Sequence, residues 1–234
     1  MTRILITGAA GGIGQALLAE MRDGHDVLAT DIRQPATLPE GAEYRPLDVR
    51  ADDPDAVIGE WKPDVVVHLA SIVTPPRGST PALSPLPGGA RKRRCEPMRA
   101  FADLLESSAP ARVVNIASVA AHHGMANNAA YCASKAGLLG LGRCVSLEGA
   151  AHGVTCVSIS PTWVETEMLR SFIDADIAAS GKSREEVRAD YAASNPQHQL
   201  VQPEEIADLA AFLVSDAGRA ITMEDVQVNA GSLW

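Results

Sequence analysis

The chain contains few aromatic residues and no long apolar run. Its 234 residues include three each of Trp, Tyr and Phe, so aromatic residues make up 4% of the chain while hydrophobic residues make up 46%. This balance favours a core of Val, Ile, Leu and Ala, which is typical of buried parallel strands covered by helices. No apolar segment approaches the ~20 residues of a membrane-spanning helix. A strand at Arg3–Thr7 leaves no room for a signal peptide, and we therefore expect a soluble cytoplasmic protein.

Cysteine is scarce as well. The four cysteines, Cys95, Cys132, Cys144 and Cys156, show no metal-ligand spacing, which argues against a metal site. Thiols without a disulfide framework fit a reducing compartment. The patterns around Cys144 and Cys156 predict small buried thiols, one in a helix and one in a strand.

An excess of positive charge is also lacking. The net charge is −9, which argues against nucleic acid as the main partner. We expect a small-molecule substrate and neither a nucleic-acid nor a membrane partner. The basic cluster Arg91–Arg94 is the exception to this acidic balance.

Strand and helix patterns alternate along the chain. The expected strands are Arg3–Thr7, His25–Thr30, Glu43–Leu47, Asp64–Leu69, Val113–Ser118, Val154–Pro161 and Asp225–Asn229. Such alternation predicts an α/β fold: a single-domain, doubly wound parallel sheet of the Rossmann type, with helices on both faces, over residues 1–234. Ligands then bind at the carboxyl ends of the strands, where Gly8, Ser71, Ser118 and Pro161 fall.

The first strand leads into a glycine-rich turn, Thr7-Gly8-Ala9-Ala10-Gly11-Gly12-Ile13-Gly14. Such a turn places backbone N–H groups and the positive end of a helix against a phosphate. Gly8 permits the tight turn, Gly12 the close approach of a pyrophosphate, and Gly14 the packing of helix on strand.

Asp31 ends the next strand, where an acid can accept hydrogen bonds from adenosine ribose hydroxyls and repel a 2′-phosphate. NAD is therefore expected in preference to NADP. Arg33 is the residue that could swing onto a 2′-phosphate instead.

Tyr131 and Lys135 lie four residues apart, which places them on one face of a helix, and Ser118 precedes them at the end of a strand. A fixed ammonium favours the phenolate, and bringing a tyrosine pKa from about 10 to about 7 takes roughly 4 kcal/mol. Lys135 and a positively charged nicotinamide could supply this together. Tyr131 would then exchange a proton with an alcohol or a carbonyl near neutral pH.

These motifs resemble the short-chain dehydrogenase/reductase family over nearly the whole chain. The matching residues are Thr7-Gly-x-x-x-Gly12-x-Gly14, Asp48-Val49, Ser118, Tyr131-x-x-x-Lys135, Pro161 with Thr166, and Glu204-Glu205-Ile206-Ala207. The resemblance implies that Ser118 orients the substrate oxygen, that Tyr131 exchanges the proton, and that Lys135 binds the nicotinamide ribose while tuning Tyr131. The residues expected to hold the cofactor are Gly8, Gly11, Gly12, Ile13, Gly14, Asp31, Asp48, Val49, Leu69, Ala70, Ser71, Tyr131, Lys135, Pro161, Thr162, Val164 and Thr166.

The chain departs from this family in four places. The usual Asn-Asn-Ala-Gly is His68-Leu69-Ala70-Ser71, as in the sugar-nucleotide epimerase branch, and Pro161 is followed by Thr162 rather than glycine. The usual Asp-Gly-Gly is Asn229-Ala230-Gly231. No asparagine precedes Asn115, so the helical asparagine that carries a proton-relaying water in relatives is missing.

Residues 74–97 hold six of the fifteen prolines and the Arg91–Arg94 cluster, and they predict an irregular loop where the family has a helix. Three interpretations remain open: a solvated insertion, a shifted reading frame in the gene, and a loop that binds phosphate or a partner. A helix is expected to follow at Met98–Ser107.

Residues 167–200 are expected to form a substrate lid that excludes water, or else a surface helix pair without a gating role. The polar segment Met168–Asn195 carries helical patches with a break at Gly181. Candidates for the pocket lining are His122, His123, Trp163, Met168 and Phe172. The resemblance also implies a homodimer or homotetramer, formed through the helix at Met98–Ser107 and the helix of Tyr131.

Three functions are compatible with these residues. The first is an NAD-dependent oxidoreductase that interconverts a secondary alcohol and a ketone on a small polar substrate, such as a hydroxy acid or a sugar derivative. The second, suggested by His68-Leu69-Ala70, is an epimerase or dehydratase that uses bound NAD transiently. The third is a catalytically impaired NAD-binding regulator, suggested by the missing asparagine and the unusual loop.

Overall fold

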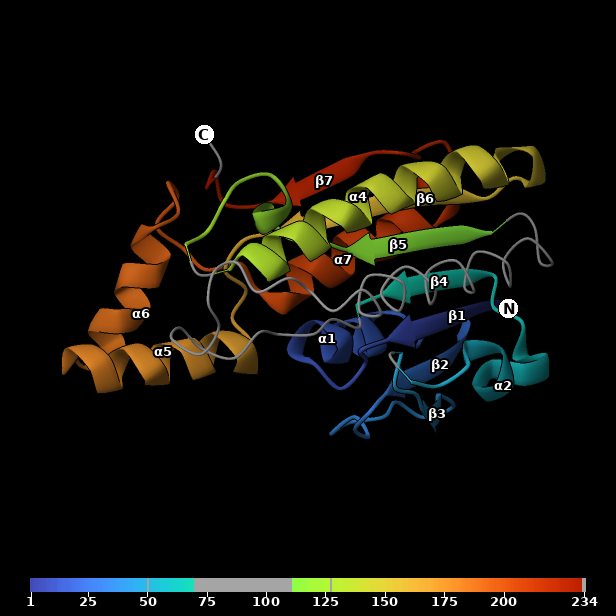
Figure 1. Cartoon of the computed structure of the whole chain (residues 1–234). Coiled ribbons are helices and arrows are strands. Elements are labelled where there is room, and N and C mark those ends of the chain that lie inside the picture. The colour runs from blue at the N-terminus through green and yellow to red at the C-terminus, as the bar shows by residue number, and fades with distance from the viewer. Residues whose placement is uncertain (50, 70–110, 127, 233–234) are drawn as a thin grey trace.

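The computed structural model describes residues 1–49, 51–69, 111–126 and 128–232. Within these residues, seven strands form one sheet in the order β3-β2-β1-β4-β5-β6-β7, and every neighbouring pair is parallel. The strands are β1 Thr2–Thr7, β2 His25–Asp31, β3 Glu43–Pro46, β4 Val65–His68, β5 Arg112–Ile116, β6 Thr155–Pro161 and β7 Asp225–Val228. The predicted doubly wound parallel sheet is confirmed (Figure 1).

The central strands are buried because helices cover both of their faces. All four residues of β4 and the last four of β1 are buried, whereas the edge strands β3 and β7 contain no fully buried residue. The predicted strand bounds are correct to within two residues. The largest difference is at β5, which ends at Ile116 because Ser118 already caps a 3-10 helix, η2, at Val119–Ala121.

Helices α1 Gly12–Glu20 and α7 Pro203–Val214 pack on each other and on one face of the sheet. Helix α4, Ala129–Gly149, and the short α2, Pro54–Ile58, cover the other face, where Ile58 and Val145 join Leu5 and Val66 in a second apolar cluster. Three further 3-10 helices, η1 Gly59–Trp61, η3 Ala150–His152 and η4 Asp216–Gly218, lie in the connections. These two layers fix the side of the sheet on which each polar side chain lies.

Helices α5 Glu167–Ser180 and α6 Arg184–Ala193 form an arm that projects beyond the carboxyl ends of the strands (Figure 1). Gly181 ends α5 in the left-handed conformation, which confirms the predicted break, and Ser183 starts α6 with a capping box. The arm has its own apolar cluster of Leu169, Ile173, Val187 and Leu200. The segment is therefore more regular than its polar sequence indicated.

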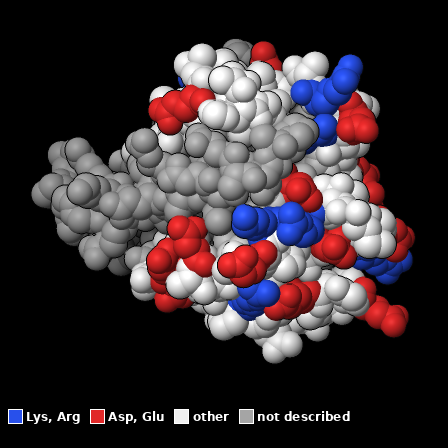
Figure 2. Space-filling view, turned by 90° about the vertical axis from the view of Figure 1, so that its right-hand side faces the viewer, with Lys and Arg blue, Asp and Glu red and all other residues white. Residues whose placement is uncertain are grey.

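The predicted loop at 74–97, its Arg91–Arg94 cluster and the predicted helix Met98–Ser107 lie outside the described residues. None of the helices in the part of the chain that the structure describes is long and apolar enough to cross a membrane. On the face shown in Figure 2, acidic and basic side chains are interspersed rather than gathered by sign.

Candidate active site

The strand order reverses between β1 and β4, which creates a crevice at the carboxyl ends of the strands. Thr7 of β1 is in register with His68 of β4, and His68 is in register with Asn115 of β5. The glycine-rich turn after β1 and the Ser118 turn after β5 therefore leave the sheet at the same edge.

The glycine turn has the backbone geometry that a pyrophosphate needs. Gly8 has a φ of 73°, and a Cβ on Gly14 would lie 2.5 Å from the Gly8 carbonyl oxygen, so both positions require glycine. Gly11 is the N-cap of α1, and no side chain caps this helix. The first-turn N–H groups are thus available to an anion, and the turn fits a dinucleotide.

Gly12 has a neighbour that its sequence context did not indicate. A Cβ at this position would lie 2.7 Å from the Thr166 methyl carbon. The missing side chain lets the first turn of α1 pack against the segment that follows β6. The pyrophosphate expected beside Gly12 stays a prediction.

Asp31 is held beside the glycine turn by two backbone donors. The Ala10 N–H donates to one carboxylate oxygen at 3.1 Å, and the Arg33 N–H donates to the other at 3.0 Å. This places a fixed negative charge where an adenosine ribose would lie. The Arg33 side chain is exposed.

The remaining residues expected on the adenosine side are only partly within the described chain. The Asp48 N–H donates to Asp52, and Val49 packs against the apolar cluster below α4. The Leu69 N–H continues the sheet by donating to the Thr7 carbonyl at 3.1 Å. Ala70 and Ser71 lie outside the described residues.

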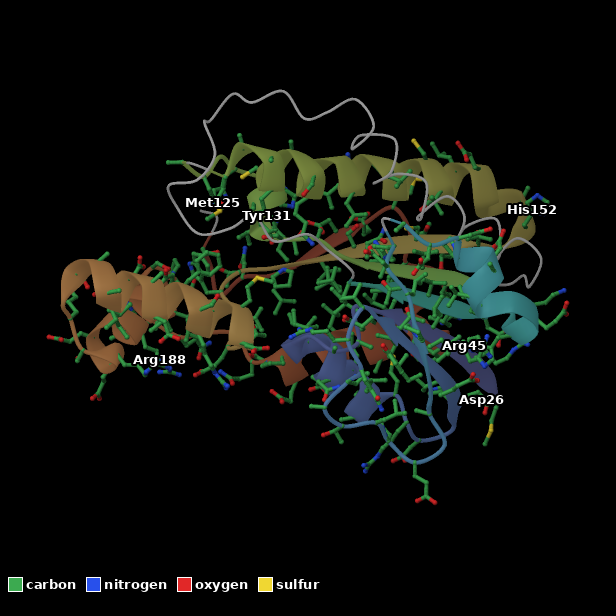
Figure 3. The ribbon with its side chains drawn as sticks, turned by 60° about the horizontal axis from the view of Figure 1, so that its bottom comes forward. Asp26, Arg45, Met125, Tyr131, His152 and Arg188 are labelled. Atoms are coloured by element: carbon green, nitrogen blue, oxygen red, sulfur yellow. The ribbon has the colours of Figure 1, made fainter. Side chains whose placement is uncertain are left out.

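Ser118, Tyr131 and Lys135 meet at the carboxyl end of β5. Ser118 forms a side-chain hydrogen bond with Tyr131, and its oxygen also accepts the Ala120 N–H at 3.2 Å. The Lys135 ammonium is buried, donates to the Ile116 carbonyl at 2.8 Å and lies 5.8 Å from the centre of the Tyr131 ring. Figure 3 shows Tyr131 at the end of α4 nearer to the arm, with His152 beyond the opposite end.

The electrostatics of this group differ from the expectation. Burial raises the pKa of Tyr131, the hydrogen bond with Ser118 lowers it, and nearby Cys132 raises it, with a net upward shift. Burial lowers the pKa of Lys135 to about 8. We expected Lys135 to lower the pKa of Tyr131, but the net shift is upward because desolvation of the phenol dominates. The part assigned to a bound nicotinamide stays a prediction.

A row of buried polar side chains lies beneath α4. Thr7, His68, Asn115 and Ser158 are in register on four neighbouring strands, and therefore point to the same face, the one that α4 covers. The His68 Nδ1 lies 2.8 Å from the Thr7 hydroxyl. Burial and the Lys135 charge lower the pKa of His68 to about 4, so its imidazole is neutral.

Asn115 is the least satisfied member of this row. Its amide nitrogen donates to the Cys156 sulfur at 3.3 Å, but its amide oxygen is buried and has no hydrogen-bond partner among the described residues. The sequence reasoning named His68 only as a departure from a motif and did not find the row. A signal for the row was present in the sequence, because Asn115 stands between Val114 and Ile116, and Ser158 stands between Val157 and Ile159.

The segment after β6 joins the site to the arm. Pro161 is buried at the end of β6, and the Thr162 hydroxyl donates at 3.0 Å to Asn195, which is fully buried. Val164 forms a parallel bridge with Val201, and Thr166 is the N-cap of α5. Contacts with Asn195 and Val201 therefore hold in place the segment that is expected to bind a nicotinamide.

The candidates for the pocket lining do not gather in one place. Trp163 packs edge-on against Phe172 and Tyr191, with ring centres 6.1 and 4.8 Å away, and these rings belong to the packing of the arm. Met168 and His123 are exposed. His122 contacts Asp225 on β7, a partner that its sequence position did not indicate.

One prediction about the cysteines is wrong. Cys156 is buried, and its burial raises the pKa of the thiol to about 12, but Cys144 is exposed on α4. The small-residue pattern around Cys144 continues onto the outer face of the helix. Among the described residues, no group of three or more His, Cys, Asp or Glu is placed to hold a metal ion.

Together the fold and the site define a class: a Rossmann-type protein with a dinucleotide turn and a Ser–Tyr–Lys group. A family model described as enoyl-(acyl carrier protein) reductase matches residues 95–232, and one described as the NAD-dependent epimerase/dehydratase family matches residues 4–84. The chain belongs to the short-chain dehydrogenase/reductase family and is an NAD(P)-dependent oxidoreductase.

Several known proteins are similar over nearly their full length. The uncharacterized oxidoreductase YxjF of Bacillus subtilis is 29% identical over 257 residues, covering 97% of this chain and 96% of the relative. The 3-oxoacyl-[acyl-carrier-protein] reductase FabG of Vibrio cholerae is 28% identical over 250 residues, covering 97% and 95%.

Solved structures agree on the fold. A short-chain dehydrogenase family protein of Francisella tularensis has a TM-score of 0.86 at 23% identity, covering 99% of this chain and 98% of the other. An actinorhodin polyketide ketoreductase with NADPH has a TM-score of 0.80 at 25% identity, covering 99% and 97%. The 3-ketoacyl-(acyl-carrier-protein) reductase of Brucella melitensis, complexed with NADH, has a TM-score of 0.78 at 20% identity, covering 99% and 98%.

Proposed function

We propose that the protein uses NAD to interconvert a secondary alcohol and a ketone on a small polar substrate, with Tyr131 as the acid/base. The observation that carries this proposal is the meeting of Ser118, Tyr131 and Lys135 at the strand edge that also bears the glycine turn. Ser118 and Tyr131 share a hydrogen bond, so their two hydroxyl groups lie close together. A substrate carbonyl oxygen bound between them would accept a hydrogen bond from each hydroxyl. Reduction of a ketone needs a proton donor at the carbonyl oxygen, and the two hydroxyl groups can bind that oxygen and protonate it.

The chain's own residues supply binding, orientation and the proton. Gly8, Gly11, Gly12, Ile13 and Gly14 would hold the pyrophosphate, and Tyr131, Lys135 and the Pro161–Thr166 segment would hold the nicotinamide end. A bound dinucleotide would supply the hydride chemistry. Tyr131 would give its proton to the substrate oxygen in reduction and take it back in oxidation, while Lys135 holds a positive charge beside it.

We assign NAD rather than NADP because of Asp31. Both of its carboxylate oxygens accept backbone hydrogen bonds, so the charge has no freedom to move away from a 2′-phosphate. One of the similar solved structures contains NADPH and another contains NADH, so these structures do not decide between NAD and NADP. The assignment rests on the carboxylate alone.

The substrate class has a second candidate. Relatives named 3-oxoacyl-[acyl-carrier-protein] reductase and acetoacetyl-CoA reductase favour a 3-oxoacyl thioester. Hydroxy acids and sugar derivatives remain our first proposal, because α6, in the arm beyond the strand ends, is rich in charged residues and buries only Val187. Both candidates use the same proton and hydride transfer.

A substrate panel monitored at the NADH absorbance band tests the proposal. The panel includes secondary hydroxy acids, sugars, polyols and, in the reverse direction, 3-oxoacyl thioesters. Net formation or consumption of NADH supports the oxidoreductase. Product without net NADH supports the epimerase or dehydratase alternative. The match of residues 4–84 to the epimerase/dehydratase family model favours that alternative. Cofactor binding without turnover of any compound supports a regulator and contradicts our proposal.

We also propose that the protein is a homodimer or homotetramer without a nucleic-acid or membrane partner. The outer face of α4 supports this, because most of the residues that it exposes between Ala133 and Leu147 are small or apolar, with Arg143 as the charged one: Ala133, Ala136, Gly137, Gly140, Cys144 and Leu147. Analytical ultracentrifugation at micromolar concentration tests the proposal, and a single monomer peak would contradict it.

A further inference from the structure

A 3-10 helix of three residues carries the catalytic serine at one end and a histidine at the other. Ser118 is the N-cap of η2, and His122 is its C-cap. Inside this turn the Ala121 N–H donates to the Ser118 carbonyl at 2.8 Å, and the His122 N–H donates to the Val119 carbonyl at 2.9 Å. Two backbone hydrogen bonds therefore couple the two end residues through the turn.

His122 is tied to the far edge of the sheet. Its Nε2 lies 2.6 Å from a carboxylate oxygen of Asp225 on β7, and the other carboxylate oxygen accepts the Ser160 hydroxyl of β6 at 2.7 Å. Because a carboxylate oxygen can only accept, Nε2 carries the proton. His122 and Asp225 are 103 residues apart in the sequence, and Ser160 and Asp225 are 65 residues apart.

The contact joins a partly exposed imidazole to a nearly buried carboxylate. The Asp225 side chain is only 10% exposed, the His122 side chain is 29% exposed, and Ser160 is fully buried. A carboxylate removed from water needs partners that replace its hydration. His122 and Ser160 are the side chains that the described part of the chain provides, so the loss of His122 would leave one oxygen unpaired.

We propose that His122 is a positioning residue that holds the Ser118 hydroxyl in place through η2, with Asp225 and Ser160 as its anchor. This inference rests on the proposed function of Ser118. The Ser118 oxygen accepts the Ala120 N–H inside the turn and contacts Tyr131 on α4, so the tilt of η2 sets how Ser118 meets Tyr131. Clamping the free end of the turn to two strands keeps that tilt fixed before the substrate binds.

Variants of His122 test the proposal by steady-state kinetics. His122→Ala is expected to lower kcat by roughly ten- to hundredfold, since a shift of about 1 Å at a catalytic group has that effect. The Kd for NAD is expected to stay within twofold, because η2 follows β5, and β4 lies between β5 and the strand β1 that leads into the glycine turn. His122→Gln keeps an N–H donor and is expected to restore most of kcat. His152→Ala, at the far end of α4, is the control for the loss of an exposed histidine.

A double-mutant cycle separates positioning from general stabilisation. If His122 acts through Ser118, then His122→Ala has no further effect on kcat once Ser118→Ala is present. Full additivity of the two losses would overturn the proposal, as would a wild-type kcat in His122→Ala.

The proposal can fail separately from the proposed function. If the wild-type protein turns over no compound, hydrogen exchange of the Ala120, Ala121 and His122 amides is the readout. Faster exchange in His122→Ala, and not in His152→Ala, supports the clamp. Unchanged exchange overturns it, whatever the activity of the protein.

Discussion

At the scale of single residues, the site combines a buried phenol with a buried amine. Burial alone raises the pKa of Tyr131 and lowers that of Lys135, so each group is driven towards its neutral form. A neutral tyrosine is the correct starting state for giving a proton to a carbonyl. The opposite direction needs a positive charge beside the ring, which Lys135 keeps at neutral pH because its pKa is about 8.

Removing the Tyr131 hydroxyl separates catalysis from binding. Tyr131→Phe is expected to lower turnover by at least about 10²-fold, because the general acid/base is lost. NAD affinity is expected to survive, since the ring and Lys135 remain. Turnover with the preferred substrate and NAD binding by fluorescence titration check this prediction. Full activity in the variant would contradict the role of Tyr131.

His68 makes stability depend on pH in the acid range. Its pKa is about 4 in the fold and 6.5 as the ordinary value, so between these values the unfolded chain binds a proton that the folded chain does not. The free energy of unfolding therefore falls as the pH falls through this window, by about 3 kcal/mol from this residue. His68→Asn lacks this dependence.

Urea unfolding of the wild type and of His68→Asn from about pH 7 to about pH 4 measures the difference. The wild type is expected to lose more stability than the variant over this range, while His152→Asn is expected to follow the wild type. Parallel curves for the wild type and His68→Asn would show that the imidazole is not held neutral.

At the scale of elements, the start of α1 depends on the absence of side chains. A Cβ at Gly14 would lie within 2.8 Å of backbone atoms of Gly8 and Ala9. These backbone atoms cannot move away unless β1 or α1 also shifts. Gly140 is also helical, but nothing lies within 4 Å of its Cβ position. The two glycines therefore allow a matched comparison.

Gly14→Ala is expected to cost roughly 1–3 kcal/mol of stability and to abolish NAD binding, because the clash lies inside the phosphate turn. Gly140→Ala is expected to raise stability by about 0.5–1 kcal/mol, since alanine favours a helix interior. Chemical denaturation and cofactor titration of both variants check the pair. Equal stability of the two variants would contradict the close packing of α1 on the turn.

The arm is also an element whose order is built in. Two caps, the aromatic packing of Trp163 and the buried Asn195 fix it to the end of β6. This order favours a preformed wall of the site over a segment that folds only on the substrate. A gating motion of the whole arm stays a prediction.

At the scale of the whole molecule, cofactor binding is coupled to folding. The proposed site draws on β1, α1, β2, α4 and the segment after β6, so a ligand there binds only the assembled sheet. NAD at one hundred times its Kd is expected to stabilise the protein by about 2.7 kcal/mol, which raises Tm by several degrees. NADP at the same concentration is expected to have a smaller effect, because Asp31 repels its 2′-phosphate.

Asp31→Ala tests the source of this preference. The difference between the Tm shifts with NAD and NADP is expected to shrink or reverse in the variant, as measured by scanning fluorimetry. A larger shift with NADP than with NAD in the wild type would contradict the assignment of NAD.

The sequence by itself determined the order of the elements and the parallel sheet, and it predicted Ser118, Tyr131 and Lys135 as the catalytic group. These follow from local patterns: short segments rich in Val, Ile and Leu, glycine in the first turn, and a tyrosine and a lysine one helical turn apart. The family resemblance rests on the same local text, and both the fold and the family are confirmed.

Only the tertiary structure decided which distant residues meet. Thr166 against Gly12, Asn195 beneath Thr162, the polar row around Asn115 and the contact of His122 with Asp225 all join segments that no pattern links. The direction of the Tyr131 pKa was decided in the same way, because it depends on how much water the packed helix excludes from the phenol. Spacing along the chain sets which side chains share a face, whereas burial and long-range contacts arise only when the layers close on one another.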